Sequence, residues 1–102
     1  MNIFKRTNRF SKWIDKLKDR QAQRIILARL KRAAEGDFGD VQPVGSGVSE
    51  MRIHFGKGYR VYYGRLGETV YLLLAGGDKS EQQKDINVAI AMWKTLKGHN
   101  DE

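Results

Sequence analysis

Titratable side chains occupy alternate positions in two short apolar runs near the middle of the chain. The runs span residues 49–55 and 59–63. Arg52, His54 and Arg60 lie between apolar or aromatic neighbours, and Glu50 lies between Ser49 and Met51. An arginine fork binds phosphate oxygens through paired N–H donors, and an imidazole can transfer a proton near neutral pH. A carboxylate beside them could act as a general base. These residue types together indicate a site that binds a phosphate ester and performs acid–base chemistry on it.

Four more side chains extend this candidate site. Lys79 follows a Gly-Gly pair, a turn at which a backbone can approach a ligand closely. The rings of Tyr59 and Tyr62 could stack on nucleic-acid bases, and Lys57 lies in the glycine-flanked turn between the two runs. The alternative is that all of these are ordinary surface residues, because Glu, Arg and Tyr are common on a solvent-facing sheet.

The alternation predicts two strands of an antiparallel hairpin. Strand side chains alternate faces with a period of two, so the apolar and charged residues of each run lie on opposite faces. A turn over residues 56–58 joins the strands, and pairing Phe55 with Tyr59 keeps the apolar faces together. In that register His54 lies opposite Arg60, and Arg52 lies opposite Tyr62. The predicted polar face carries Glu50, Arg52, His54, Arg60 and Tyr62 side by side.

Two amphipathic helices precede this hairpin. Residues 2–6 predict a short edge strand, after which Thr7 or Asn8 caps the first helix. Asp19 caps the second helix, which ends near Gly36. Their apolar stripes consist of Phe10, Trp13, Ile14 and Leu17 in the first helix, and Ala22, Ile25, Ile26, Leu30 and Ala33 in the second. We expect this helical hairpin to cover the apolar face of the sheet.

The rest of the chain predicts a loop, a buried strand and a third helix. Residues 36–47 are rich in turn formers and predict the loop. Residues 70–75 are continuously apolar, which is typical of a strand buried on both faces. Ser80 opens a capping box for the third helix, and Gly98 ends it. We predict an α+β fold, with an N-terminal strand and helical hairpin packed on a small, mainly antiparallel sheet and a C-terminal helix.

Length and composition narrow the class of protein. The 102 residues predict one domain over residues 1–102. No apolar run is long enough to span a membrane, and the N-terminus lacks the apolar core of a signal peptide. The chain has no Cys and two widely separated His residues, so we expect no disulfide, no metal and no cofactor. These features favour a cytoplasmic protein.

Positive charge is concentrated in the first third of the chain. The net charge of the whole chain is +7, whereas residues 1–35 hold eleven Lys and Arg against three acidic residues, a net +8. Such an imbalance favours a polyanion or an acidic protein as partner, although a helix surface kept soluble by charge is the alternative. The candidate docking surface consists of Lys12, Lys16, Arg20 and Arg24.

The chain resembles the RelE/ParE superfamily of bacterial toxins, most closely its HigB-like branch of addiction-module killer proteins. The resemblance covers roughly residues 3 to 97, in the order strand, basic helical hairpin, three-stranded meander and terminal helix. Three segments are the closest match: residues 50–55, residues 58–63 with their Gly-Tyr-Arg, and residues 74–80 with their Gly-Gly-Asp-Lys-Ser, followed by Gln83, Asp85 and Ile86.

This resemblance implies the toxin of a type II toxin–antitoxin system, a metal-independent endoribonuclease that cleaves messenger RNA on the ribosome. In the reaction that it implies, the 2′-hydroxyl of the RNA attacks the adjacent phosphate. Arg52, His54, Arg60 and Lys79 match basic residues of the family's site, whereas Asp85 stands where a catalytic tyrosine is found in RelE. The general base is therefore open among Glu50, His54 and Tyr62. The implied partners are a helix-turn-helix antitoxin, the ribosome and messenger RNA.

Two other functions compete with this interpretation. The same fold inhibits DNA gyrase in ParE-like proteins, which generally lack the cluster of basic and His residues seen here as Arg52, His54 and Lys79. A non-catalytic module that binds nucleic acid is the other alternative.

Overall fold

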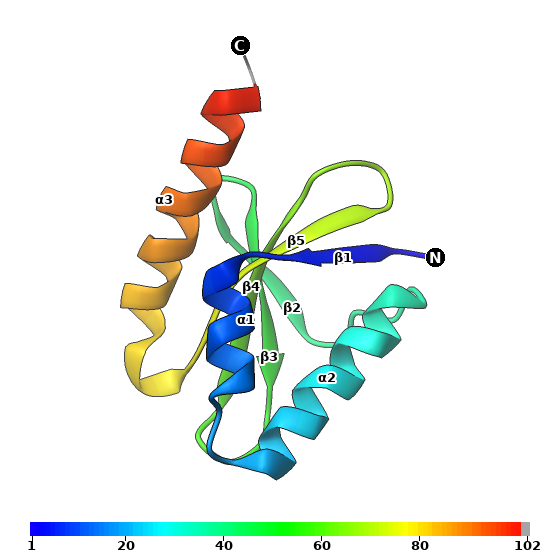
Figure 1. The fold of residues 1–102 in the computed structure, drawn as a ribbon, viewed down its shortest axis with the longest axis vertical. Helices are drawn as coiled ribbons and strands as arrows, with labels where there is room; N and C mark the ends of the chain where they lie inside the picture. Colours follow the sequence, from blue (N-terminus) through cyan, green and yellow to red (C-terminus); the bar gives the residue numbers. More distant parts are fainter. Residues whose placement is uncertain (101–102) are drawn as a thin grey trace.

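A five-stranded sheet forms the centre of the computed structural model, which describes residues 1–100. The strand order is β1-β5-β4-β3-β2; β1 pairs in parallel with β5, and every other pairing is antiparallel. Figure 1 places the strands between α3 on one side and α2 on the other. The elements are β1 (Ile3–Arg6), α1 (Asn8–Asp15), α2 (Arg20–Ala34), β2 (Val41–Gly45), β3 (Val48–Ile53), β4 (Tyr59–Arg65), β5 (Val70–Asp78), a 3-10 turn (Lys79–Glu81) and α3 (Gln82–Asn100). The predicted α+β fold is confirmed.

Local capping signals set the first two helices as predicted. The side chain of Thr7 accepts a hydrogen bond from the backbone N–H of Phe10, so Thr7 rather than Asn8 caps α1. Asp19 accepts from the N–H of Ala22 and caps α2. Beyond α2, Gly36 adopts a φ of 105°, a left-handed conformation that glycine tolerates at a helix end.

The start and end of the third helix differ from the prediction. Asp78, not Ser80, is the capping residue, and its carboxylate accepts from the backbone N–H of Ser80 at 2.9 Å. This bond opens a 3-10 turn, so α3 itself begins at Gln82. The helix also continues past Gly98 to Asn100. A single glycine lowers helix stability by only about 1 kcal/mol, which does not by itself end a helix.

The segment predicted as a loop, residues 36–47, contains the strand β2. It pairs with β3 through Val41↔Met51 and Gln42↔Glu50, with a shift in register between Pro43 and Gly45. The strand lies at the edge of the sheet, where proline is tolerated because one side of the strand needs no N–H donor. The turn-forming residues of this segment led us to predict a loop, whereas residues 41–45 form a short edge strand.

Each face of the sheet has its own apolar core. The first core lies under α1 and α2 and includes Phe10 and Ile26 from the helices with Met51, Val61 and Leu73 from the strands. The second lies under α3 and includes Val48, Tyr62, Leu74, Ala75, Ala89 and Trp93. β5 contributes to both cores, which confirms that its centre is buried on both faces. The helical hairpin therefore covers the predicted apolar face, and α3 covers part of the predicted polar face.

Candidate functional site

The β3–β4 hairpin has the predicted faces but not the predicted register. Ile53 pairs with Tyr59 and Arg52 pairs with Arg60, whereas we predicted Phe55 opposite Tyr59. The true register is shifted by two residues, which leaves every side chain on its expected face. One consequence is that β3 ends at Ile53, so His54 lies in the connection and not opposite Arg60.

Glu50 is the fully buried carboxylate at the centre of this face. Its Oε1 accepts a hydrogen bond from Nε of Arg52 at 2.9 Å, and its Oε2 accepts from Nε2 of Gln82 in α3 at 2.9 Å. The Nε of Arg60 lies 3.5 Å from Oε2. Burial raises the pKa of Glu50, but the hydrogen bonds from Arg52 and Gln82 and the charge of Arg60 outweigh it, so the pKa is lowered. Glu50 therefore positions two arginines and is a poor general base.

Both tyrosines predicted to stack on bases are buried. Tyr62 is fully buried beneath α3, and within residues 1–100 its hydroxyl has no hydrogen-bond partner. Its burial and the negative charge of Glu50 raise the pKa of that hydroxyl, which makes it a poor base as well. Tyr59 is only 4% exposed and packs in the opposite core, 6.4 Å from the ring of Trp13. The stacking prediction for Tyr62 is wrong, and Tyr59 leaves little of its surface accessible to a base.

His54 is hydrogen-bonded to a carboxylate that the sequence did not reveal as its partner. Its Nε2 lies 2.6 Å from Oδ2 of Asp40, and this pairing lowers the pKa of Asp40. The imidazole is exposed, with 74% of its side-chain surface accessible. Asp40 is held beside the end of β3 because its carbonyl accepts from the backbone N–H of Arg52 at 2.9 Å. The pair orients the ring and leaves its other nitrogen free for a ligand.

The end of the hairpin forms an open groove of about 430 Å³. Five of its side chains are basic: Arg52, His54, Lys57, Arg60 and Lys79. We call this surface the cationic groove. Among the described residues, none that lines the cationic groove is Asp or Glu. Six predicted site residues thus meet in this groove, these five and Tyr59, with Glu50 beneath them.

Arg60 and Lys79 approach each other across Gly58, which has a φ of 76°. A Cβ at Gly58 would lie 3.3 Å from the Cβ of Lys79 and 3.4 Å from Nη1 of Arg60. The same Nη1 donates to the Gly58 carbonyl at 2.7 Å, and the side chain of Arg60 is only 13% exposed. The positive φ and the close packing both require glycine here, so this turn brings the two cations together.

Gly76 and Gly77 allow helices to pack closely against the sheet, and they do not form the ligand-binding turn that we predicted. Both lie inside β5 rather than in a turn. A Cβ on Gly76 would collide with the ring of Trp13 from α1, and a Cβ on Gly77 would collide with the Asp85 carboxylate from α3. Burial raises the pKa of Asp85 in this position. The glycine pair therefore lets one helix approach from each side of the sheet.

The predicted docking surface divides into two parts. Lys12 and Lys16 line a second groove, next to the cationic groove. Arg20 instead donates to the carbonyl of Asp15 at 3.3 Å and to Gln23 at 3.4 Å, and Arg24 is exposed on α2. The four residues do not line one common hollow.

Asp40 and Gln82 are the site residues that sequence reasoning missed. Asp40 lies in the segment that we predicted as a loop, and Gln82 lies within the capping box that we predicted to open at Ser80. They reach His54 and Glu50 across 14 and 32 positions of the chain. No local pattern signals a contact over such separations.

Two further findings concern metals and membranes. Among residues 1–100, His, Asp and Glu side chains nowhere gather in a group of three that could hold a metal ion. No helix in the described part of the chain is both long enough and apolar enough to cross a membrane.

Comparison with known proteins identifies a relative but no wider family. No protein-family model matches the chain. A Haemophilus influenzae protein (strain ATCC 51907 / DSM 11121 / KW20 / Rd), described as an uncharacterized protein, is 47% identical over 92 residues. The match covers 90% of this chain and 93% of the relative. The chain belongs to the same family as this Haemophilus protein.

Proposed function

We propose that the chain is the toxin of a type II toxin–antitoxin pair, a HigB-like member of the RelE/ParE superfamily that cleaves messenger RNA on the ribosome. The cationic groove is the observation that carries the proposal. Its four Lys and Arg side chains match the negative charge of an RNA backbone, and His54 beside them can move a proton. The order of strand, helical hairpin, meander and terminal helix agrees with that superfamily as well.

In the proposed reaction the 2′-oxygen of one nucleotide attacks the adjacent phosphorus. His54 takes the proton of the 2′-hydroxyl during attack and returns a proton to the 5′-oxygen of the next nucleotide as the bond from phosphorus to that oxygen breaks. The products are a 2′,3′-cyclic phosphate and a 5′-hydroxyl. Negative charge builds on the phosphate oxygens during attack. Arg52, Arg60 and Lys79 stabilise that charge, because donors fixed in advance need no reorganisation as the reaction proceeds.

His54 is the proton-transfer group in this proposal. Of the three bases left open by the sequence, Glu50 and Tyr62 are fully buried. Glu50 already accepts hydrogen bonds from Arg52 and Gln82, and burial raises the pKa of the Tyr62 hydroxyl. His54 alone is exposed in the groove, with Asp40 holding its ring. Glu50 acts through Arg52 and Arg60 as a positioning residue. The protein would work in the cytoplasm, where ribosomes and an antitoxin are available.

Cleavage on translating ribosomes tests the proposal. Purified ribosomes with a defined messenger are mixed with the protein, and the 5′ ends of the fragments are mapped. We expect cuts within the ribosome-bound codons and 5′-hydroxyl ends, and no cuts in the same RNA without ribosomes. Inhibition of gyrase supercoiling without messenger cleavage would replace the proposal by a ParE-like function. Binding of RNA with neither effect would indicate a non-catalytic module.

A further inference from the structure

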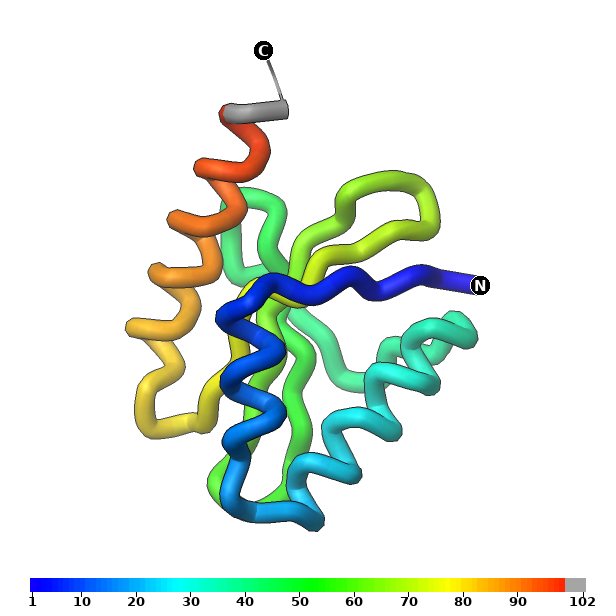
Figure 2. The backbone as a smooth tube through the Cα atoms, viewed as in Figure 1, coloured from blue at the N-terminus to red at the C-terminus, as the bar shows by residue number. Residues whose placement is uncertain are grey.

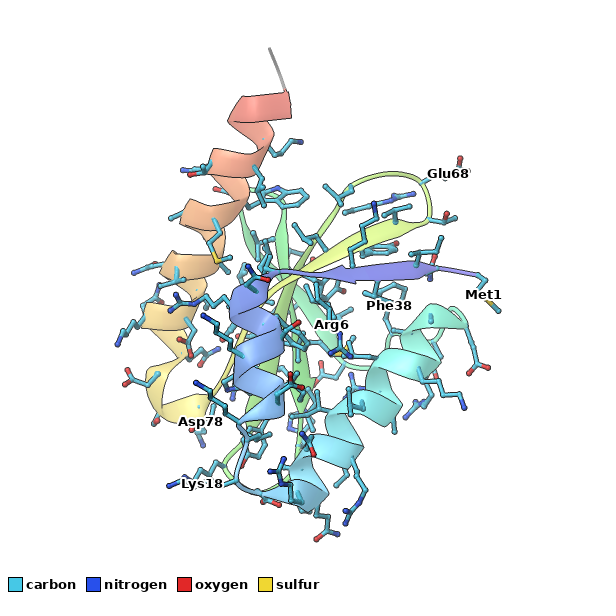
Figure 3. The ribbon with its side chains drawn as sticks, in the orientation of Figure 1. Met1, Arg6, Lys18, Phe38, Glu68 and Asp78 are labelled. Atoms are coloured by element: carbon cyan, nitrogen blue, oxygen red, sulfur yellow. The ribbon has the colours of Figure 1, made fainter. Side chains whose placement is uncertain are left out.

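A second open groove, of about 690 Å³, adjoins the cationic groove. One wall comes from the end of α1 and the turn after it, and the other comes from the β3–β4 connection. Figure 2 shows these two turns, far apart in sequence, meeting at the same end of the molecule. Figure 3 shows Lys18 and Asp78, which both line the groove, on the same side of that end. The volume falls within the range typical of small-ligand sites.

The chemistry of this groove combines an apolar floor with a cationic rim. Trp13 of α1 and Leu17 of the turn after it are half-buried and supply apolar surface, together with the small exposed part of Tyr59. The exposed side chains of Lys12, Lys16 and Lys18 stand around it, and we call this surface the lysine-rimmed groove. A flat apolar group that carries negative charge beside it is the ligand that such a surface suits, and a nucleotide has that form.

Two carboxylates also line the groove, and both already have partners. Asp19 caps α2 by accepting from the N–H of Ala22 at 3.0 Å. Asp78 accepts from the N–H of Ser80, and its hydrogen bonds to Ser80 lower its pKa. These two carboxylates offset part of the positive charge. The lining also includes Lys57, so it holds four lysines against two carboxylates and stays positive.

The two grooves are continuous. Gly56, Lys57 and Tyr59 line both of them, so a strand of RNA that fills one would enter the other. This continuity favours RNA over an acidic protein segment as the occupant, because the cationic groove next to it suits phosphate.

We propose that the lysine-rimmed groove is a nucleobase subsite. It holds the base of a nucleotide next to the phosphate in the cationic groove, against Trp13 and Leu17, while the lysines hold the flanking backbone. The inference rests on the proposed function for the nature of its ligand, single-stranded RNA. It assigns to Lys12 and Lys16 a role in RNA binding rather than only in docking an antitoxin.

Binding to uncleavable RNA tests the subsite without any need for cleavage. The probes are a short 2′-O-methyl RNA oligonucleotide and the same oligonucleotide with one abasic position. We expect about tenfold weaker binding of the abasic probe, as is typical for loss of one base contact. In a Trp93→Phe variant, Trp13 is the only tryptophan. We expect the fluorescence of Trp13 to change when the intact probe is added and not when the abasic probe is added. If that variant fails to fold, anisotropy with the unaltered chain still compares the two probes.

A pair of charge reversals tests the location. Lys16→Glu with Lys18→Glu alters the groove, whereas Lys31→Glu with Lys94→Glu makes the same change in charge at exposed positions outside both grooves. We expect the first pair to weaken RNA binding and ribosomal cleavage by at least about tenfold more than the second, since salt-screened attraction at a distance affects both equally.

The outcomes separate the subsite from the proposed function. If the protein cleaves messenger RNA but binds intact and abasic probes equally, the subsite is wrong and the function stands. Base-dependent binding near Trp13 without ribosomal cleavage would support the subsite and reject the nuclease. A response of Trp13 to polyglutamate but not to RNA would overturn the subsite in favour of an acidic protein.

Discussion

Glu50 and Arg52 lie two residues apart on β3 and form an ion pair in which Glu50 is in the interior and Arg52 reaches the surface. The Nε of Arg52 donates to Oε1 of Glu50 at 2.9 Å. The carboxylate is fully buried, whereas 31% of the Arg52 side chain is exposed. The buried partner therefore fixes the orientation of a guanidinium whose other N–H groups remain available to a ligand. The sequence indicates Glu50 as a candidate general base, but in this geometry Glu50 positions the guanidinium of Arg52.

Replacing Glu50 with Gln should destabilise the fold. The amide keeps the size of the side chain, but its NH₂ group faces the donors of Arg60 or Gln82 and leaves one of them unsatisfied. We expect a loss of about 1–3 kcal/mol in the free energy of unfolding, measured by urea denaturation. Glu68→Gln, at an exposed turn position, is the matched control and should change little. Equal stability of both variants would show that the buried charge contributes nothing.

The stability of the unaltered chain should depend on pH through the same carboxylate. The folded-state pKa of Glu50 is lowered, so its contribution is complete above the unfolded pKa of about 4.3 and is lost as pH falls through the folded value. The difference in stability between the unaltered chain and Glu50→Gln should therefore be constant from neutral pH to about pH 4 and shrink below it. Denaturation series at several pH values measure this. A difference that grows in acid would contradict the lowered pKa.

Arg60→Lys should separate charge from geometry. Lysine keeps the positive charge but cannot donate in two directions, to the Gly58 carbonyl and to a phosphate, in the same plane. We expect a loss of about 10²-fold in ribosomal cleavage, similar to removal of one fixed donor at a developing oxyanion. Arg65→Lys is the control, because Arg65 bonds only to the Gly67 and Glu68 carbonyls within residues 1–100. Full activity of Arg60→Lys would reject its role at the phosphate.

His54→Ala should remove proton transfer and leave the fold unchanged. Both His54 and Asp40 are exposed, so their loss opens no cavity. Single-turnover cleavage should fall by about 10²–10⁴-fold for His54→Ala. Asp40→Asn, which keeps the ring but weakens its orientation, should cost less. Thermal melts provide the control for folding. Cleavage that survives His54→Ala would require another proton-transfer group.

Gly77→Ala should destabilise the sheet through Asp85, and a second change should rescue it. The new methyl group meets the Asp85 carboxylate, and overpacking of this kind costs about 1–3 kcal/mol. Removing the obstacle with Asp85→Ala should recover most of that loss in the double variant, as a double-mutant cycle would show. Gly67→Ala, where the nearest atom lies at 3.9 Å, is the control. If the two changes add independently, the contact is not the reason for glycine.

The sequence alone determined the features that depend on neighbouring residues. Alternation in residues 49–55 and 59–63 assigned Glu50 and Arg52 to one face and Met51 and Ile53 to the other. Asp19 indicated the start of α2, because its side chain accepts a hydrogen bond from a backbone N–H three residues away. These signals are local, so they survive without knowledge of the rest of the fold.

Tertiary structure decided the register, the layers and the partners. A shift of two residues preserves both faces of a hairpin, so alternation could not distinguish Phe55 from Ile53 as the partner of Tyr59. The position of α3 over Tyr62, the bond from Gln82 to Glu50 and the contact of Asp40 with His54 all join distant segments. Such contacts form because packing of the whole chain brings these segments together. The residue types indicated the chemistry of the site, and only packing separated its buried supports from its exposed groups.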